Sequence, residues 1–96
     1  MGPKTKQLTV VLEKLILILN EDKEHHWASW MSQAKSRITS SDYSGIEKVL
    51  GAYGGMGSFT DVRLEKISRS NEHFSELRSE AWRLATEIKR EHEANR

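Results

Sequence analysis

Apolar residues recur at helical spacing in the first part of the chain. Between about Lys4 and Leu19 they fall every three or four positions, which is the spacing of one face of an α-helix. This face consists of Leu8, Val11, Leu12, Leu15, Ile16 and Leu19. Val10, Leu17 and Ile18 widen it, so we expect this helix to be the most deeply buried element. A β-strand over 15–19 is the alternative, because that run contains β-branched residues.

A second helix is predicted over about 22–38. Its buried stripe is formed by Trp27, Trp30, Met31, Ala34 and Ile38, which again follow helical spacing. Asn20 or Asp22 is suited to cap its N-terminus, because both side chains accept hydrogen bonds from the free backbone N–H groups there. The short link between the first two helices predicts that they lie antiparallel.

A shorter third helix of about three turns is predicted to follow Ser41 and Asp42. Either of these two residues can serve as its N-cap. Its buried edge comprises Ile46, Val49, Leu50 and Tyr53. Gly54 or Gly55 can end it in the left-handed conformation that glycine adopts without steric cost.

The clearest helical pattern lies near the C-terminus. Asn71 is predicted as the N-cap of a long helix. Its apolar face is formed by Phe74, Leu77, Ala81, Leu84, Ala85 and Ile88. No apolar residue larger than alanine follows Ile88, so we expect this end to fray over about 90–96, and the chain start over about 1–4.

Four of the six glycines lie between Gly51 and Asp61. A glycine costs a helix interior roughly 0.5–1 kcal/mol relative to alanine, so this cluster marks unusual backbone. We interpret it as a hinge that reverses the chain, with Met56 and Phe59 filling the core beside it. A short helical element is expected between Phe59 and Ile67, and an extended stretch is the alternative. The predicted fold is an all-α, single-domain bundle over residues 1–96. It has three main helices and this short fourth helical element after the glycine hinge.

Composition narrows the classes of function. Fifteen Lys and Arg residues against fourteen Asp and Glu give a net charge of +1, which provides no field to steer the protein toward nucleic acid or an anionic membrane. The absence of cysteine excludes disulfide, thiolate and cysteine–zinc chemistry. The adjacent His25 and His26 point about 100° apart on a helix, so they cannot chelate one metal ion. The longest apolar run, 15–19, is too short to span a membrane. We therefore expect a cytoplasmic protein without a metal or cofactor.

The glycine segment 54–58 is a candidate anion site. Backbone N–H groups of Gly55, Gly57 and Ser58, placed ahead of a helix, can form a nest that binds phosphate or carboxylate. The segment lacks the lysine of a nucleotide-binding P-loop, and Asp61 would repel an anion. A simple chain reversal is therefore the favoured interpretation, with anion or small-ligand binding as the alternative.

Basic residues over 63–69 give a second alternative. Arg63, Lys66 and Arg69 are spaced by three and could contact phosphates. Glu65 and Glu72 interleave with them, and no aromatic platform accompanies them. We therefore expect at most a weak association with nucleic acid.

The favoured candidate site is a protein–protein surface. Trp82 lies off the apolar face of the last helix, between Arg78 and Arg83. Tryptophan and arginine are enriched at the centres of interfaces. We place Met56, from the edge of the glycine segment, in the same candidate interface. The alternative is that Trp82 packs against the first helix and only widens the core.

The run Tyr53 to Asp61 reads Tyr-Gly-Gly-Met-Gly-Ser-Phe-Thr-Asp. It resembles a Tyr-Gly-Gly-Met-Gly-Ser-Phe-Asn-Asp motif in a family of small uncharacterised bacterial proteins. Thr60 departs from the family's Asn. The resemblance extends over about 25–90 through Trp27 and Trp30, and through Phe74, Leu77-Arg78 and Ala81-Trp82 in the last helix. It implies a bacterial or phage origin and an all-helical domain.

The sequence therefore predicts a non-enzymatic interaction protein. The chain is small, carries no catalytic or metal motif, and has mixed charge. An immunity-like, inhibitor-like or regulatory adaptor protein fits these properties. The expected partner is another protein, and a homodimer is one form that such an interaction can take.

Overall fold

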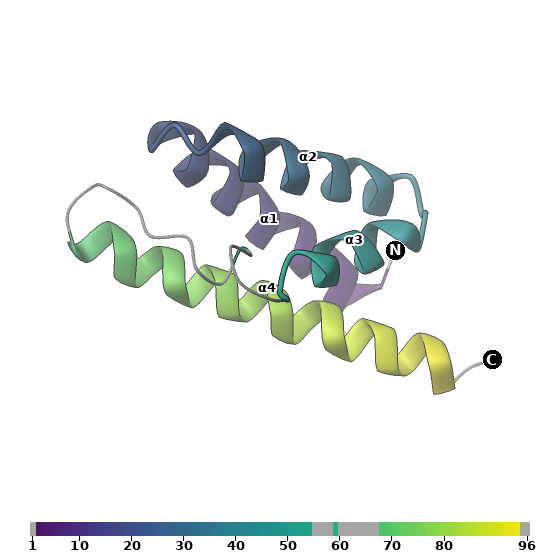
Figure 1. The fold of residues 1–96 in the computed structure, drawn as a ribbon. Coiled ribbons are helices and arrows are strands. Elements are labelled where there is room, and N and C mark those ends of the chain that lie inside the picture. The colour runs from purple at the N-terminus through teal and green to yellow at the C-terminus, as the bar shows by residue number, and fades with distance from the viewer. Residues whose placement is uncertain (1, 55–58, 60–67, 95–96) are drawn as a thin grey trace.

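The chain folds into α-helices. The computed structural model describes residues 2–54, 59 and 68–94. Its helices are α1 (Pro3–Glu21), α2 (His25–Thr39), α3 (Ser44–Gly51) and α4 (Ser68–Ala94), shown in Figure 1. The described residues contain no strand, so the all-α prediction is confirmed and the alternative strand over 15–19 is wrong. The predicted element between Phe59 and Ile67 falls, apart from Phe59 itself, outside the described residues.

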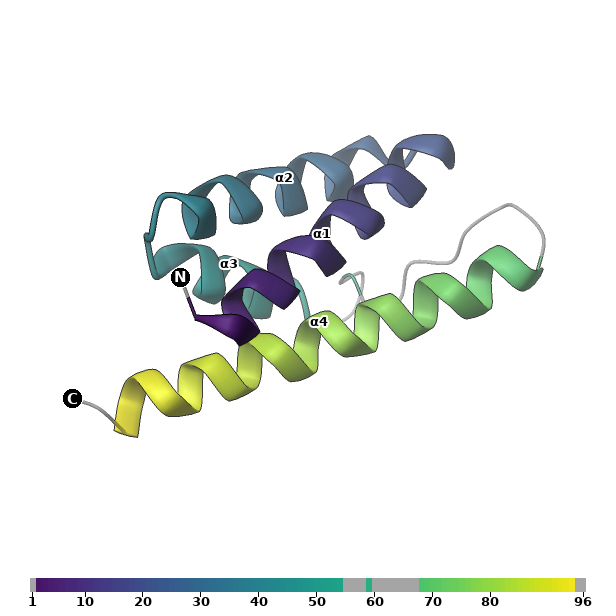
Figure 2. The same ribbon diagram turned by 180° about the vertical axis from the view of Figure 1, so that it is seen from behind.

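Helix α1 lies between α2 and α4. It packs mainly against these two helices, while α3 bridges α2 and α4 (Figures 1 and 2). Helices α1 and α2 form the predicted antiparallel pair. Helix α4 is antiparallel to α1 as well, because Lys4 near the start of α1 lies 2.6 Å from Glu91 near the end of α4.

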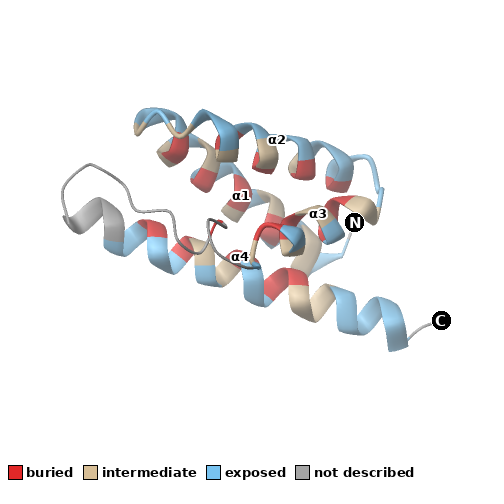
Figure 3. Ribbon diagram, in the orientation of Figure 1, coloured by how far each residue is buried: buried red, intermediate tan, exposed pale blue. Residues whose placement is uncertain are grey.

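The core contains the faces that the helical spacing predicts. Its buried members on α1, α2 and α4 include Leu8, Leu12, Leu15, Leu19, Met31, Ala34, Phe74, Leu77, Ala81 and Leu84. These residues lie on the sides of the helices that face the interior (Figure 3). Trp30 and Leu50 are only partly buried, at the rim. The predicted widening of α1 is wrong at two positions, because Val10 is 46% and Leu17 61% exposed. Helix α1 packs mainly against α2 and α4, so only the face of α1 that is turned toward these two helices is buried.

Both ends of α2 are set by non-glycine residues in the left-handed conformation. Lys23, just after α1, has φ 63°, and Ser41, just after α2, has φ 61°. At each turn two backbone N–H groups bond back to carbonyls of the last helical turn, as in a Schellman motif: Lys23 to Asn20 and Glu24 to Leu19, then Ser41 to Ile38 and Asp42 to Arg37. The predicted capping of α2 by Asn20 or Asp22 is therefore wrong. Helix α1 runs through Asn20 and has Asp22 as its C-cap.

Helix α3 begins at a turn closed by Asp42. Its Oδ1 accepts a hydrogen bond of 2.9 Å from the backbone N–H of Ser44. Hydrogen bonds from Ser44 hold the pKa of Asp42 below its ordinary value. The N-cap position itself is Tyr43, which forms no side-chain cap hydrogen bond, so the prediction of Ser41 or Asp42 as N-cap is wrong, although Asp42 accepts a hydrogen bond from the first helical residue. The helix ends at Gly51, with Ala52 in right-handed helical conformation, so the predicted end at a left-handed Gly54 is wrong. Gly55 lies outside the described residues.

Gly45 allows α3 to approach α2 closely. A Cβ atom at this position would lie 2.7 Å from the carbonyl oxygen of Ala34 and 2.8 Å from the backbone nitrogen of Ile38. These atoms belong to the backbone of α2 and cannot swing aside. Glycine is therefore required here by lack of space, since its φ is not in the left-handed region.

Helix α4 is longer than its apolar pattern. It begins at Ser68, so the prediction of Asn71 as its N-cap is wrong. Asn71 lies within the first turn of the helix instead. At the other end the helix continues past Ile88 to Ala94. In this last part, Glu91 forms an ion pair with Lys4 of α1. The predicted fraying of both chain ends remains a prediction.

Candidate functional site

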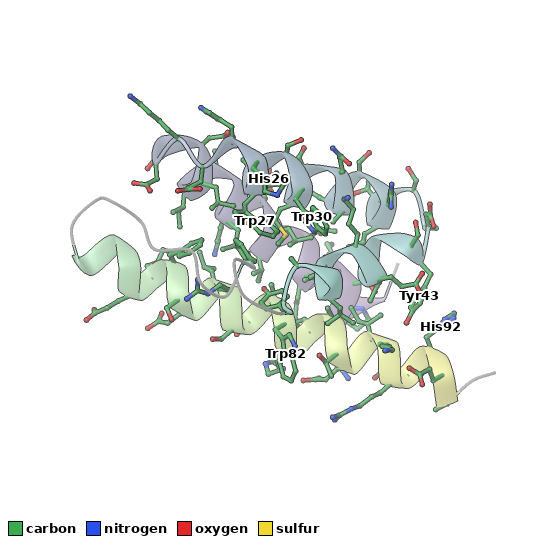
Figure 4. The ribbon with its side chains drawn as sticks, viewed as in Figure 1. His26, Trp27, Trp30, Tyr43, Trp82 and His92 are labelled. Atoms are coloured by element: carbon green, nitrogen blue, oxygen red, sulfur yellow. The ribbon has the colours of Figure 1, made fainter. Side chains whose placement is uncertain are left out.

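An exposed tryptophan projects from the middle of α4. Trp82 is 48% exposed and points away from the bundle (Figure 4). It lines a shallow hollow together with Tyr53, Arg78 and Ser79. We call these four residues the Trp82 surface. The alternative prediction was that Trp82 packs against the first helix, and the exposure of its side chain argues against it.

Tyr53 fixes one wall of the Trp82 surface. It follows α3, and its hydroxyl donates a hydrogen bond of 2.7 Å to the backbone carbonyl of Arg78 on α4. Burial of the phenol raises the pKa of Tyr53 well above its ordinary value, although the nearby Arg78 charge acts in the opposite direction. The hydroxyl therefore stays protonated and keeps donating throughout the neutral range.

Arg78 is directed into the protein rather than toward a partner. Its Nη1 donates a hydrogen bond of 3.0 Å to the carbonyl of Phe59, and its guanidinium lies 5.0 Å from the ring centre of Phe74. Phe59 is fully buried, as predicted, and its N–H donates to the carbonyl of Ala52 at 2.9 Å. Arg78 thus ties Phe59 to α4, and this contact holds the Arg78 side chain in place within the Trp82 surface.

Aromatic rings form the floor beneath this surface. Phe59 packs at 5.6 Å from both Tyr53 and Phe74, edge to face in each case, and at 5.3 Å from Trp27. Such edge-to-face pairs contribute about 0.5–1.5 kcal/mol beyond their burial. The predicted assignment of Trp27 and Trp30 to the core or its rim agrees with their partial burial. Through the buried ring of Phe59, these contacts join Trp27 of α2, Phe74 of α4 and Tyr53, which follows α3.

Arg83 belongs to a different surface. Its guanidinium is held by Glu80 at 2.7 Å and Glu87 at 2.8 Å, and these hydrogen bonds raise the pKa of Arg83. It lines a neighbouring hollow that shares Ser79 with the Trp82 surface. This hollow is acidic, because Glu72, Glu76 and Glu80 also border it. The sequence placed Arg83 and Trp82 in one interface, but neighbours in a helix point about 100° apart. The structure accordingly places Arg83 in the neighbouring hollow and not among the residues that line the Trp82 surface.

A family model for a domain of unknown function (DUF6966) matches residues 20–73, which is more than half of the chain. The chain belongs to the DUF6966 family. No curated protein and no solved structure matches it. The DUF6966 match covers α2, α3 and the first residues of α4, and it ends at His73. Of the Trp82 surface it therefore includes Tyr53 alone.

Several predicted site residues of this DUF6966 chain lie outside the described residues. They are Met56 of the candidate interface, Gly55, Gly57 and Ser58 of the candidate anion site, and Arg63 and Lys66 of the basic stretch, together with the side chain of Arg69. Within the described ranges, no group of three or more His, Cys, Asp and Glu residues could hold a metal ion. None of the described helices is long and apolar enough to cross a membrane.

Sequence reasoning missed Tyr53 and Ser79 as members of the site. Tyr53 was assigned to the buried edge of the third helix, and it is indeed only partly exposed. Its hydroxyl has a partner 25 positions away along the chain, and no local pattern reports such a contact. Ser79 gives a weaker local signal, because it lies one helical turn before Trp82.

Proposed function

We propose that this DUF6966 domain is a non-enzymatic protein–protein interaction module, and that its contact surface centres on Trp82. The observation that carries the proposal is that Trp82 is 48% exposed beside a wall that hydrogen bonds hold in place. An immunity-like, inhibitor-like or regulatory adaptor protein of bacterial or phage origin remains the expected context.

Burial of Trp82 against a partner would provide a substantial part of a binding free energy. A tryptophan can bury about 150–250 Å², and about half of that area is still free here. At roughly 25 cal/mol per Å², this corresponds to about 2–3 kcal/mol. That range is typical of interface residues whose truncation weakens binding strongly.

The wall beside Trp82 lowers the cost of binding. Tyr53 and Arg78 are fixed by hydrogen bonds to backbone carbonyls, and Phe59 is locked among other rings. Such side chains have little rotamer freedom left to lose when a partner docks. A preformed wall beside an exposed ring is therefore a better recognition surface than an isolated exposed tryptophan.

The chemistry of the surface indicates the kind of partner. The guanidinium of Arg78 is engaged by the Phe59 carbonyl and the Phe74 ring, so the centre offers an indole and a phenol rather than a projecting charge. Ser79 adds a hydroxyl at the edge. We expect a partner protein that presents an apolar pocket to the indole, bordered by hydrogen-bonding groups.

The test compares Trp82→Ala with Arg90→Ala, a control at another exposed position of α4. Proteins captured on the immobilised wild-type chain are identified, purified and titrated against each variant by calorimetry. We expect Trp82→Ala to weaken binding by about thirtyfold or more, and Arg90→Ala to leave it unchanged. Trp82→Phe should retain part of the affinity. A partner that binds Trp82→Ala as tightly as the wild type would overturn the proposal, provided that far-UV circular dichroism shows both variants folded.

A further inference from the structure

Two hollows adjoin on the outer side of α4. One is the Trp82 surface, and we call the other, which Glu72, Glu76 and Glu80 border, the acidic hollow. Ser79 lines both hollows, and the indole of Trp82 projects away from the bundle beside it (Figure 4). Glu76 precedes Trp82 by about 9 Å along the helix axis, which is well within the span of one protein interface. The charges of the acidic hollow therefore bear on what can dock against Trp82.

The two arginines that line these hollows already have acceptors within the chain. Nη1 of Arg78 donates a hydrogen bond of 3.0 Å to the carbonyl of Phe59. Arg83 lies 2.7 Å from Glu80 and 2.8 Å from Glu87. Neither guanidinium is therefore left to attract an anionic group of a partner.

The carboxylates of Glu72 and Glu76 are exposed and lack a donor. Among the described residues, no lysine, arginine or histidine nitrogen lies within 4.0 Å of either one. By contrast, Glu80, Glu87 and Glu91 of the same helix are each held by a basic residue. The acidic hollow therefore presents two unused negative charges next to the exposed indole.

The unused carboxylates and the indole lie at a defined spacing. Glu72 and Glu76 are one helical turn apart, about 6 Å along α4. Ser79 follows after three residues and Trp82 after three more, so the two kinds of contact lie along one side of the helix. The side chains between them are the small, exposed Ser75 and Ser79, which leave room for another chain to approach α4 closely.

We propose that the partner docks through a basic amphipathic segment. Its apolar side covers Trp82, and its lysine or arginine side chains reach Glu72 and Glu76. This inference rests on the proposed function, because it names the chemistry of the partner at the same surface. Contact with the indole provides most of the affinity. The carboxylates select and orient the segment, since exposed ion pairs add little affinity but disfavour partners of like charge.

The same charges count against other occupants. Nucleic acid or an acidic protein segment would bring negative groups against Glu72 and Glu76, with no unengaged arginine nearby to offset them. A purely apolar segment would displace water from the two carboxylates without replacing its hydrogen bonds, which is unfavourable. A basic segment satisfies both the ring and the carboxylates.

Two synthetic peptides test the charge preference. Both are fluorescently labelled amphipathic helices of about 18 residues with the same leucine face, and the flanking positions are lysine in one and glutamate in the other. Each is titrated with the whole chain by fluorescence anisotropy. We expect the lysine peptide to bind about tenfold or more tightly than the glutamate peptide at low salt, and the difference to shrink as NaCl is added. A lysine peptide that binds no better than the glutamate peptide, or not at all, would overturn the inference.

Charge variants of the chain locate the effect. Glu72→Gln together with Glu76→Gln should weaken binding of the lysine peptide by roughly three- to tenfold. The matched control is Glu13→Gln together with Glu93→Gln, which removes two exposed carboxylates outside the acidic hollow and should leave binding unchanged. The double variant E72K/E76K should reverse the preference and favour the glutamate peptide. Equal effects of the site pair and the control pair would show that only the net charge of the protein matters, and would overturn the inference.

Trp82→Ala separates this inference from the proposed function. It should weaken binding of the lysine peptide about tenfold or more. If it does so while the Glu72 and Glu76 variant binds as tightly as the wild type, the basic partner is excluded and the Trp82 surface stands. If the carboxylate variant weakens binding and Trp82→Ala does not, the peptide docks without the indole, which would overturn both. Far-UV circular dichroism establishes that each variant is folded.

Discussion

Replacement of Gly45 by alanine is the sharpest test of the packing between α2 and α3. The added Cβ would lie 2.6 Å from Cγ1 of Ile38, 2.7 Å from the carbonyl oxygen of Ala34 and 2.8 Å from the backbone nitrogen of Ile38. The Ile38 side chain can rotate away. The two backbone atoms cannot, so α3 has to shift outward by roughly half an ångström.

The magnitude follows from two opposing effects. Alanine stabilises a helix by roughly 0.5–1 kcal/mol relative to glycine. Overpacking of a close contact costs about 1–3 kcal/mol, and backbone atoms place this site at the upper end. We therefore expect Gly45→Ala to reduce the free energy of unfolding by about 2 kcal/mol. For a domain of this size, that lowers Tm by about 8–16 °C.

Gly51→Ala is the matched control, because it adds the same methyl group to the same helix. Its Cβ would meet only Cζ2 of Trp30, at an ordinary 3.8 Å. Here we expect a gain of about 0.5 kcal/mol. Urea unfolding followed by circular dichroism at 222 nm measures both variants. If Gly45→Ala proves as stable as Gly51→Ala, the close approach of α3 to α2 is not what requires glycine at this position.

Three further predictions concern the turns, the buried phenol and the exposed indole. Lys23→Gly and Ser41→Gly should each raise stability by about 0.5–1 kcal/mol, because relief of left-handed strain outweighs the freedom that glycine gains when unfolded; unchanged urea midpoints would contradict this. Tyr53→Phe should cost about 1 kcal/mol at neutral pH through the lost hydrogen bond. Because burial raises the pKa of Tyr53 in the folded state, the stability contributed by its neutral form is present below about pH 10 and declines as pH rises further. Between neutral pH and about pH 10.5, the free energy of unfolding should therefore fall less in Tyr53→Phe than in the wild type. Equal falls in the two proteins would refute the raised pKa of Tyr53. In a variant that retains Trp82 as its sole tryptophan, emission should be red-shifted and readily quenched by acrylamide, whereas a shielded indole would count against an exposed Trp82.

The helical pattern was readable from local spacing. Leu8, Leu12, Leu15 and Leu19 fall on one helical face, and all four are fully buried. The faces of α2 and α4 were predicted for the same reason, since a helix in a small domain must bury one apolar stripe. The full burial of Phe59 was also predicted, because a reversal of the chain at the glycine segment was expected to place this ring in the core.

The sequence was less informative about helix ends. Cap-forming residues are frequent around the turns of this chain, and each turn offered more than one candidate. Closure by left-handed Lys23 and Ser41 was not foreseen, because these residue types favour that conformation far less than glycine does. Packing of α2 against α1 and of α3 against α2 imposes these turns, and that packing is a property of the whole fold.

For the candidate site, the sequence by itself selected Trp82 as lying off the apolar stripe, and it determined that the chain is helical with one core. Only the tertiary structure decided what surrounds Trp82. It directed Arg78 inward to Phe59, brought Tyr53 from the residues after α3 to form the wall, and left Val10 and Leu17 exposed. The physical reason is that periodicity reports which side chains share a helix face, whereas burial and hydrogen bonding depend on which other elements arrive at that face. Those elements come from distant parts of the chain, and their positions are settled only when all the helices pack together.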